Sequence, residues 1–107
     1  MAESAGALTE AVFYILLSLY RPLHGYGIMQ NVSSLSGGRV TLGAGTLYGA
    51  INTLVDKGWI IPSGEDAESR KKEYVITEKG KTAVEAELKR LEELLNNGKA
   101  IAGKESF

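Results

Sequence analysis

The sequence predicts one mainly helical domain that carries a single small β-hairpin. The chain has 107 residues, which is enough for one domain with one modest core. Apolar residues recur at helical spacing in four separate stretches. Two short β-prone stretches, residues 59–62 and 74–77, enclose a polar loop, which is the pattern of a hairpin. These observations define a mainly α fold class with one small β-hairpin.

The first expected helix starts near Leu8, where Thr9 is available as its N-cap. It ends before Pro22, because the proline ring cannot continue the helical hydrogen bonds. Apolar side chains lie on both sides of this helix, so we expect it to be buried on most faces or packed against a second subunit. The stripe expected to meet a second subunit consists of Phe13, Leu17 and Tyr20.

Two further helices are expected over residues 25–35 and 45–57. The run Ser36-Gly37-Gly38 separates them. Gly58 is typical of the residue that follows a helix C-terminus, so it should close the second of these helices. The residues of that helix expected to face the core are Leu47, Ile51 and Leu54.

The last expected helix begins after Thr77 and ends at the cluster Asn96-Asn97-Gly98. Four of its apolar residues recur with 4-3-4 spacing, which is a short seam of the kind that pairs helices. A core of this size cannot fully cover such a seam, so we expect it to join two subunits. The seam residues are Val84, Leu88, Leu91 and Leu95.

The order helix, helix, helix, hairpin, helix is typical of a winged helix-turn-helix followed by a dimerisation helix. We therefore expect a flexible N-terminal arm at residues 1–7 and a winged-helix DNA-binding domain at residues 8–77. A dimerisation helix at residues 78–97 and a flexible tail at residues 98–107 should follow.

Composition narrows the class of protein. The chain is 44% hydrophobic and 23% charged, values typical of globular domains. It has no cysteine, which excludes disulfides, thiolate metal sites and cysteine nucleophiles and fits a reducing cytosol. The apolar run at residues 11–19 is too short to cross a bilayer. We therefore expect a cytoplasmic protein with no membrane partner.

Four short segments resemble the PadR family of bacterial transcriptional regulators. They occur in the family's order and spacing over about residues 8–95, and their joint occurrence is specific although each one alone is weak. The segments are His24-Gly25-Tyr26, Gly45-Thr46-Leu47-Tyr48, Lys57-Gly58-Trp59-Ile60 after Leu54, and Thr77-Glu78-Lys79-Gly80 after Tyr74.

This resemblance implies a homodimer, joined through the last and the N-terminal helices, that binds a double-stranded DNA operator and represses transcription. It also implies a short form of the family and a possible response to a phenolic or drug-like effector. Some short relatives hold an aromatic ligand between tryptophans of their dimerisation helices. The last helix of this chain has no tryptophan, so that arrangement is not carried over.

The helix expected at residues 45–57 is the candidate recognition helix. Small residues at its start allow a close approach to the DNA backbone, and its free N–H groups favour a phosphate there. Tyr48 is expected to meet phosphate or the groove wall, and the Asn52 amide suits an adenine edge. The alternatives are that Tyr48 packs at a helix corner and that Asn52 is merely solvated. The candidate DNA-binding residues of this helix are Gly45, Thr46, Tyr48 and Asn52.

The expected wing ends in the basic run Arg70-Lys71-Lys72, which is a candidate for phosphate or minor-groove contact. A charge run is more often a solvated face, and neighbouring acids (Glu65, Asp66 and Glu68) could neutralise this one. Arg39, just before the recognition helix, is a weaker phosphate candidate.

Two other functional classes remain as rivals. The net charge of −1 favours a winged helix that binds proteins rather than DNA. The glycine-rich segment at residues 43–49 and His24 suggest a small enzyme, but the segment lacks a βαβ context and His24 lacks partners at catalytic or metal-ligand spacing. We expect no catalysis, no cofactor and no metal site.

Overall fold

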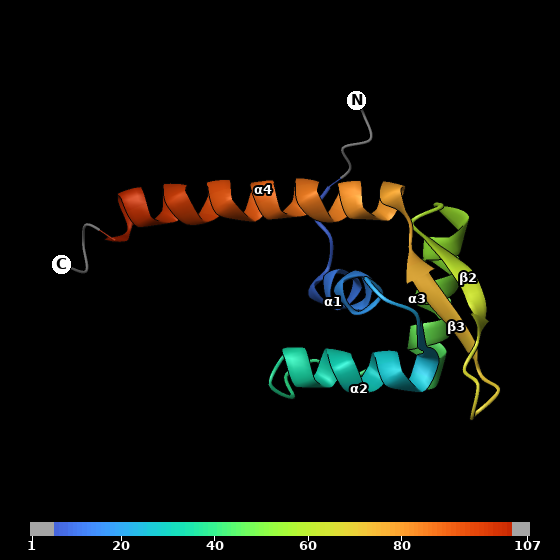
Figure 1. Ribbon diagram of the computed structural model, residues 1–107. Helices are drawn as coiled ribbons and strands as arrows, with labels where there is room; N and C mark the ends of the chain where they lie inside the picture. The colour runs from blue at the N-terminus through green and yellow to red at the C-terminus, as the bar shows by residue number, and fades with distance from the viewer. Residues whose placement is uncertain (1–5, 104–107) are drawn as a thin grey trace.

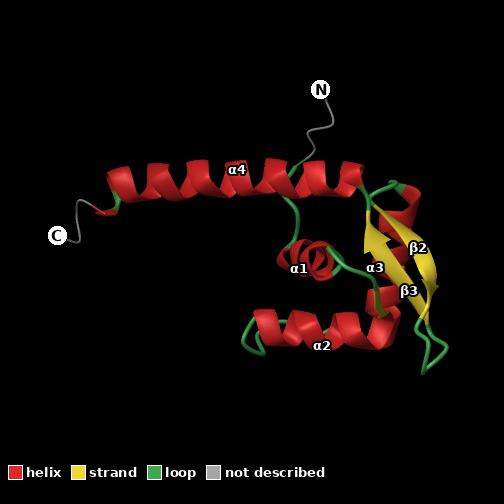
Figure 2. Cartoon of the chain, viewed as in Figure 1, coloured by secondary structure: helices red, strands yellow, loops and turns green. Residues whose placement is uncertain are grey.

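The computed structural model describes residues 6–103 as four helices and three short strands (Figure 1). Helix α2 lies on one side of α1, and α4 crosses the opposite side. Helix α3 and the sheet close one end of this stack (Figure 2). The elements are α1 (Glu10–Ser18), β1 (Leu23–His24), α2 (Gly25–Leu35), α3 (Ala44–Asp56), β2 (Ile60–Glu65), β3 (Lys72–Ile76) and α4 (Glu78–Ile101).

The expected N-terminal arm at residues 1–7 and tail at residues 98–107 are only partly described. Residues 1–5 and 104–107 lie outside the described range, and Gly6 and Ala7 have no regular structure.

Threonine side chains start the first and last helices. The Thr9 hydroxyl accepts the N–H of Val12 at 3.1 Å, which confirms Thr9 as the N-cap of α1. At α4, the Thr77 hydroxyl accepts the N–H of Gly80 at 3.1 Å and donates to the carbonyl of Gly58 at 2.7 Å. One side chain therefore both begins α4 and fixes it to the turn that precedes β2.

Gly58 ends α3 as predicted, because the turn needs a left-handed backbone. Its φ is 75°, a conformation that glycine adopts at little cost. The N–H of Gly58 donates to the carbonyl of Val55 at 2.9 Å, and the N–H of Trp59 donates to that of Leu54 at 3.0 Å. This pair of bonds is the Schellman arrangement that closes a helix and redirects the chain into the next strand.

The sheet has three antiparallel strands in the order β1-β3-β2, where the sequence predicted a hairpin of two. The strand that the prediction missed, β1, pairs Leu23 with Tyr74 and His24 with Glu73. Two residues are too short for a period-2 signal, so the sequence alone could not indicate β1. Because β1 runs directly into α2, its pairing with β3 connects the start of α2 to the wing.

The core lies where α1, α2, α3 and the sheet meet, and it includes the three inward residues predicted for α3. Val84, expected in the dimer seam, is only 2% exposed and belongs to this core. That prediction is corrected, because Val84 packs among the buried residues of its own chain. The core residues are Ile15, Leu16, Leu19, Ile28, Val32, Leu47, Ile51, Leu54, Ile60, Ile76 and Val84.

Helix α4 is longer than predicted. It continues through Asn96, Asn97 and Gly98 to Ile101, so residues 98–101 are not a flexible tail. Asparagine and glycine weaken a helix but end it only where the backbone leaves the helical region. Here the N–H of Ala102 donates to the carbonyl of Gly98 at 2.7 Å, which continues the helical pattern. Within residues 6–103, no helix is both long and apolar enough to cross a membrane.

Candidate nucleic-acid interface

The outer face of α3 carries all four candidate recognition residues. Its inner face is fixed by Leu47, Ile51 and Leu54, which are buried. The N-cap, Gly43, makes no side-chain hydrogen bond, so the first N–H groups of α3 are not capped by a neighbouring side chain. The exposed residues are Gly45, Thr46, Tyr48 and Asn52.

Tyr48 is 44% exposed and also packs against the start of α2. A Cβ atom placed on Gly25 would meet the Tyr48 hydroxyl and ring, so the phenol lies directly over the Gly25 backbone. Tyr48 is therefore both exposed, as a DNA contact requires, and packed at a helix corner, so each of the two sequence-based interpretations describes part of its environment. The glycine of the His24-Gly25-Tyr26 segment makes room for the tyrosine that α3 presents.

His24 caps α2 and faces the wing. Its Nδ1 accepts the N–H of Gly27 at 3.1 Å, so His24 is the N-cap of α2. Its Nε2 lies 3.9 Å from Oδ2 of Asp66 at the wing tip. His24 is therefore occupied by structural contacts, and among residues 6–103 no group of three or more His, Asp or Glu side chains could hold a metal ion.

The wing tip is a closed turn held by Asp66. Its Oδ1 accepts the N–H groups of Glu68 at 2.8 Å and Ser69 at 3.0 Å. These two backbone donors hold the pKa of the Asp66 carboxyl below its ordinary value, and the N–H of Ser69 has the larger effect. The basic residues Arg70, Lys71 and Lys72 leave this turn with exposed side chains.

The wing and the start of α2 are also in contact through the basic run. The Lys71 ammonium lies 5.7 Å from the centroid of the Tyr26 ring, within the range of a cation–π interaction. Tyr26 is itself 54% exposed. Three contacts thus connect the candidate elements: Lys71 with Tyr26, Asp66 with His24, and Tyr48 with Gly25.

These contacts place the wing tip and the beginnings of α2 and α3 at one edge of the molecule. Figure 1 shows this edge on the far side of the molecule from α4. Arg39 does not add a free cation to it, because the Arg39 guanidinium pairs with the Glu10 carboxylate of α1. That hydrogen bond and the Glu10 charge raise the pKa of Arg39. The Arg39–Glu10 ion pair therefore connects the α2–α3 loop to α1.

Exposed apolar side chains lie along one side of α4 from Leu88 onward. Leu91 is 40% exposed and Leu95 is 56% exposed. Towards its C-terminal end, α4 extends well beyond the rest of the domain (Figure 1). The side chains on this apolar side are Leu88, Leu91, Leu94, Leu95 and Ile101.

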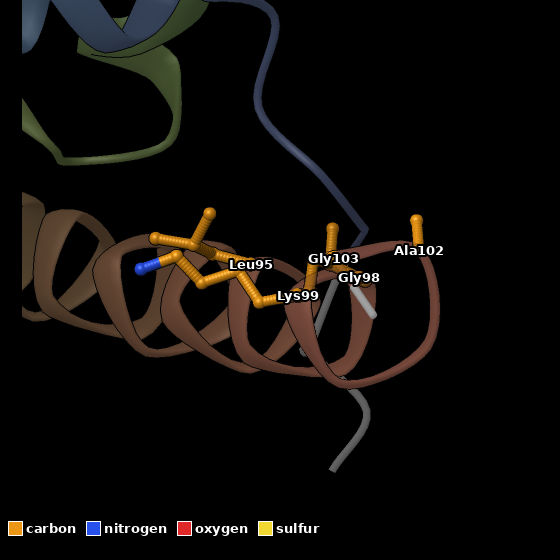
Figure 3. Close-up of a pocket in the computed structure, with 6 residues that line it drawn as sticks. Leu95, Gly98, Lys99, Ala102 and Gly103 are labelled. Atoms are coloured by element: carbon orange, nitrogen blue, oxygen red, sulfur yellow. The ribbon is translucent and has the colours of Figure 1, made fainter. Parts of the chain in front are cut away.

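An open groove of about 500 Å³ lies at the free end of α4. Figure 3 shows Leu95, Gly98, Lys99, Ala102 and Gly103 around it. Three of its lining residues, Gly98, Ala102 and Gly103, are small, so the backbone is accessible to a closely packed neighbour. Of the other stripe expected at a subunit interface, Phe13 and Leu17 are half-buried and Tyr20 is exposed beneath the Lys81 ammonium.

A smaller cavity of about 240 Å³ lies between α1 and the C-terminal half of α3. Trp59 lines this cavity and is half-buried. The Lys57 ammonium lies 4.7 Å from the ring centroid. The lining residues are Leu8, Val12, Ala50, Thr53, Leu54, Lys57 and Trp59.

The glycine-rich segment at residues 43–49 forms the first turns of α3, and no strand leads into it. It therefore lacks the strand that a dinucleotide-binding loop follows. Two residues of the candidate interface, Asp66 and Tyr26, were not predicted from the sequence. An aspartate two residues before a donor N–H is a common turn signal, so Asp66 could have been found, whereas the Lys71 contact of Tyr26 depends on the fold.

Three helices, a hairpin wing and a long C-terminal helix define a winged helix-turn-helix protein. Residues 13–86 match the transcriptional regulator PadR-like family. This match spans more than half of the chain, and the chain therefore belongs to that family. The resemblance found in the sequence is confirmed.

Solved structures support the same fold. A PadR family transcription regulator from Clostridium difficile has a TM-score of 0.73 and 20% identity, and the alignment covers 88% of this chain and 99% of that one. RosR from H. salinarum has a TM-score of 0.63 and 30% identity, with coverage of 84% and 76%. A PadR family transcriptional regulator from Eggerthella lenta has a TM-score of 0.64 and 26% identity, with coverage of 87% and 78%. No curated protein shows a significant match to this chain.

Proposed function

We propose that this protein is a sequence-specific DNA-binding repressor of transcription that acts as a homodimer and responds to a small ligand. The observation that carries the proposal is the shared edge described above. The exposed start of α3 and the basic wing tip lie together there, joined through the first turn of α2. Membership of a family of transcriptional regulators supports this use of the edge.

In the proposed complex, α3 enters the major groove and the wing follows the adjacent backbone. The uncapped N–H groups at the start of α3 and the Tyr48 hydroxyl would meet phosphate, and Asn52 would meet a base edge. Arg70, Lys71 and Lys72 would neutralise phosphates beside the groove. Occupation of a promoter by this complex would block transcription.

The proposed homodimer uses the exposed side of α4. Full burial of a leucine side chain contributes about 1.5–3 kcal/mol, so covering several half-exposed leucines favours association. Two such copies would present two α3 helices, and their spacing must match about one turn of DNA or a multiple of it.

Binding to a mixed-sequence duplex, measured across a range of salt concentrations, separates this proposal from a winged helix that binds only proteins. We expect binding at low salt that weakens steeply as salt rises, because phosphate contacts release counterions. Absence of binding at low salt would favour the protein-interaction alternative, to which the net charge of −1 is better suited.

The proposed ligand response has a candidate site in the cavity beside Trp59, because a molecule bound there would contact α3. Trp59 is the sole tryptophan of the chain, so tryptophan fluorescence comes from a side chain that lines this cavity. We expect a phenolic or drug-like effector to change Trp59 fluorescence and to weaken DNA binding over the same concentration range. A compound that weakens DNA binding without any change in this fluorescence would exclude the cavity as its site.

A further inference from the structure

The acidic side of the wing tip has an unexpected arrangement. Glu65, Asp66 and Glu68 precede the basic run in the wing, and their charges by themselves would oppose the approach of DNA. Asp66 differs from the other two because its carboxylate is bound by the protein. Its Oδ1 accepts the N–H groups of Glu68 at 2.8 Å and Ser69 at 3.0 Å, as described above.

The main chain of Asp66 closes the same turn from both sides. Its N–H donates to the carbonyl of Lys71 at 2.8 Å, and its carbonyl accepts the N–H of Arg70 at 2.9 Å. Arg70 has a φ of 63°, a left-handed conformation that a residue with a long side chain rarely adopts. The turn around Asp66 therefore holds Arg70 in a strained conformation and sets the direction in which Lys71 and Lys72 leave.

The second carboxylate oxygen of Asp66 faces inward. Oδ2 lies 3.9 Å from Nε2 of His24, the residue that caps α2. The Asp66 side chain is 31% exposed, so much of this carboxylate is covered by the turn and by the start of α2. Asp66 thus contacts both the turn that bears the basic run and the helix beside α3.

We propose that Asp66 is a positioning residue for DNA binding, which organises the wing so that its basic run meets the DNA backbone. The inference rests on the proposed function. Simple electrostatics predicts that removal of a negative charge strengthens DNA binding. The proposal predicts the opposite for Asp66: DNA binding weakens when the hydrogen bonds are removed together with the charge. Glu68 supplies the matched control, because its side chain is exposed and only its backbone N–H takes part in the turn.

The test compares Asp66→Ala, Asp66→Asn and Glu68→Ala for binding to a mixed-sequence duplex by fluorescence anisotropy. Asp66→Ala should bind at least about threefold more weakly than wild type, and the log–log salt slope should become shallower by about one for each phosphate that is no longer neutralised. Asp66→Asn should bind more tightly than Asp66→Ala, because its amide oxygen still accepts both N–H groups, whereas its NH2 group replaces the oxygen that faces His24. Glu68→Ala should bind more tightly than wild type.

Two results would overturn the inference. One is Asp66→Ala that binds DNA as tightly as Glu68→Ala, since charge alone would then explain the wing. The other is equal weakening by Asp66→Ala and Asp66→Asn, since the hydrogen-bond acceptor would then be irrelevant. A wild-type protein that binds no duplex at low salt overturns the proposed function, and the inference with it.

Backbone dynamics provide a readout that does not depend on DNA. The ¹⁵N heteronuclear NOE values of residues 67–71 should fall in Asp66→Ala and stay at wild-type values in Asp66→Asn and Glu68→Ala. Helical circular dichroism should be the same in all four proteins, because the turn lies outside the helices. Unchanged NOE values in Asp66→Ala would show that Asp66 does not order the wing tip.

Discussion

Glu87 is a charged residue placed in the interior, at only 6% exposure. Its carboxylate accepts two hydrogen bonds from the Arg90 guanidinium, at 3.0 and 2.6 Å, and one from the N–H of Leu8 at 3.3 Å. The Arg90 bonds, acting against burial, hold the pKa of Glu87 below its ordinary value of 4.5. One side chain of α4 thus fixes the segment that leads into α1.

Replacing Glu87 with glutamine should lower the free energy of unfolding by about 1–2 kcal/mol at neutral pH, because hydrogen bonds to a charged acceptor are lost. The carboxylate's contribution is complete above its unfolded pKa and is lost as the pH falls below 4.5 towards the lower folded value. The gap between wild type and Glu87→Gln should therefore narrow in acid. Urea titrations at pH 7 and pH 3.5 measure it, with the exposed Glu85→Gln as control. A gap that does not change with pH would contradict this role of Glu87.

Gly25 and Tyr48 form a second test at the residue scale. An alanine Cβ at position 25 would collide with the Tyr48 hydroxyl, which is the mobile end of a half-exposed side chain. Gly25→Ala should therefore displace the phenol rather than unfold the domain. We expect both Gly25→Ala and Tyr48→Ala to reduce DNA affinity by about tenfold, with unfolding free energies within about 1 kcal/mol of wild type.

The double variant distinguishes this coupling from two independent effects. If Gly25 acts only by making room for Tyr48, Gly25→Ala should change little in the Tyr48→Ala background. Additive losses of affinity in the double variant would mean that Gly25 contributes to binding on its own. A collapse of the melting temperature in Tyr48→Ala would place Tyr48 in the core instead.

At the scale of single residues, the sequence predicts which side chains are exposed better than it predicts which side chains pair with each other. Tyr48, Asn52 and the wing cations are exposed, because helical and strand periodicity fix which residues face outward. Arg39 was expected to be available to phosphate but is paired with Glu10. Which residues distant in the chain contact each other depends on how the helices pack. Local sequence patterns contain no information about that packing.

The wing is the element whose contribution is easiest to isolate. Lys71 and Lys72 are exposed, and the backbone bonds of the turn do not involve their side chains, although the Lys71 ammonium also contacts the Tyr26 ring. The double change of Lys71 and Lys72 to alanine should weaken binding equally for all DNA sequences. The log–log salt slope should become shallower by about one for each phosphate that a subunit no longer binds. A slope identical to that of wild type would remove the wing from the interface.

Most elements could be predicted from local signals. Thr9, His24 and Thr77 mark helix starts and Gly58 marks a helix end, because caps act within one turn of the chain. Strand β1 could not be predicted, since two residues become a strand only when β3 pairs with them. The sequence does not predict the end of α4 correctly, because its cluster of asparagine and glycine weakens the helix without ending it.

At the scale of the whole molecule, the apolar side of α4 is exposed. In the proposed homodimer, a second copy covers this side. Leu91→Glu should produce a monomer by light scattering, because a carboxylate buried at the proposed interface would have no partner. The variant should keep most of its helical signal and its weak non-specific DNA binding but lose high-affinity binding to its operator. Lys89→Glu, an exposed charge change on the same helix, is the control.

Leu95→Glu should have the same effect as Leu91→Glu, since Leu95 is still more exposed. A dimer that persists in both variants would show that α4 does not form the interface. Val84 is unsuitable for this test because it belongs to the core of its own chain.

Selection of bound sites from random-sequence duplexes by the purified wild-type protein tests the central claim most directly. It asks at once whether the shared edge of α3 and the wing binds DNA, whether it distinguishes sequences, and whether two copies bind together. We predict enrichment of inverted half-sites whose centres lie about one helical turn apart, or a multiple of it. Recovery of unenriched sequences, or of single half-sites without a repeat, would contradict a dimeric, sequence-specific DNA-binding protein.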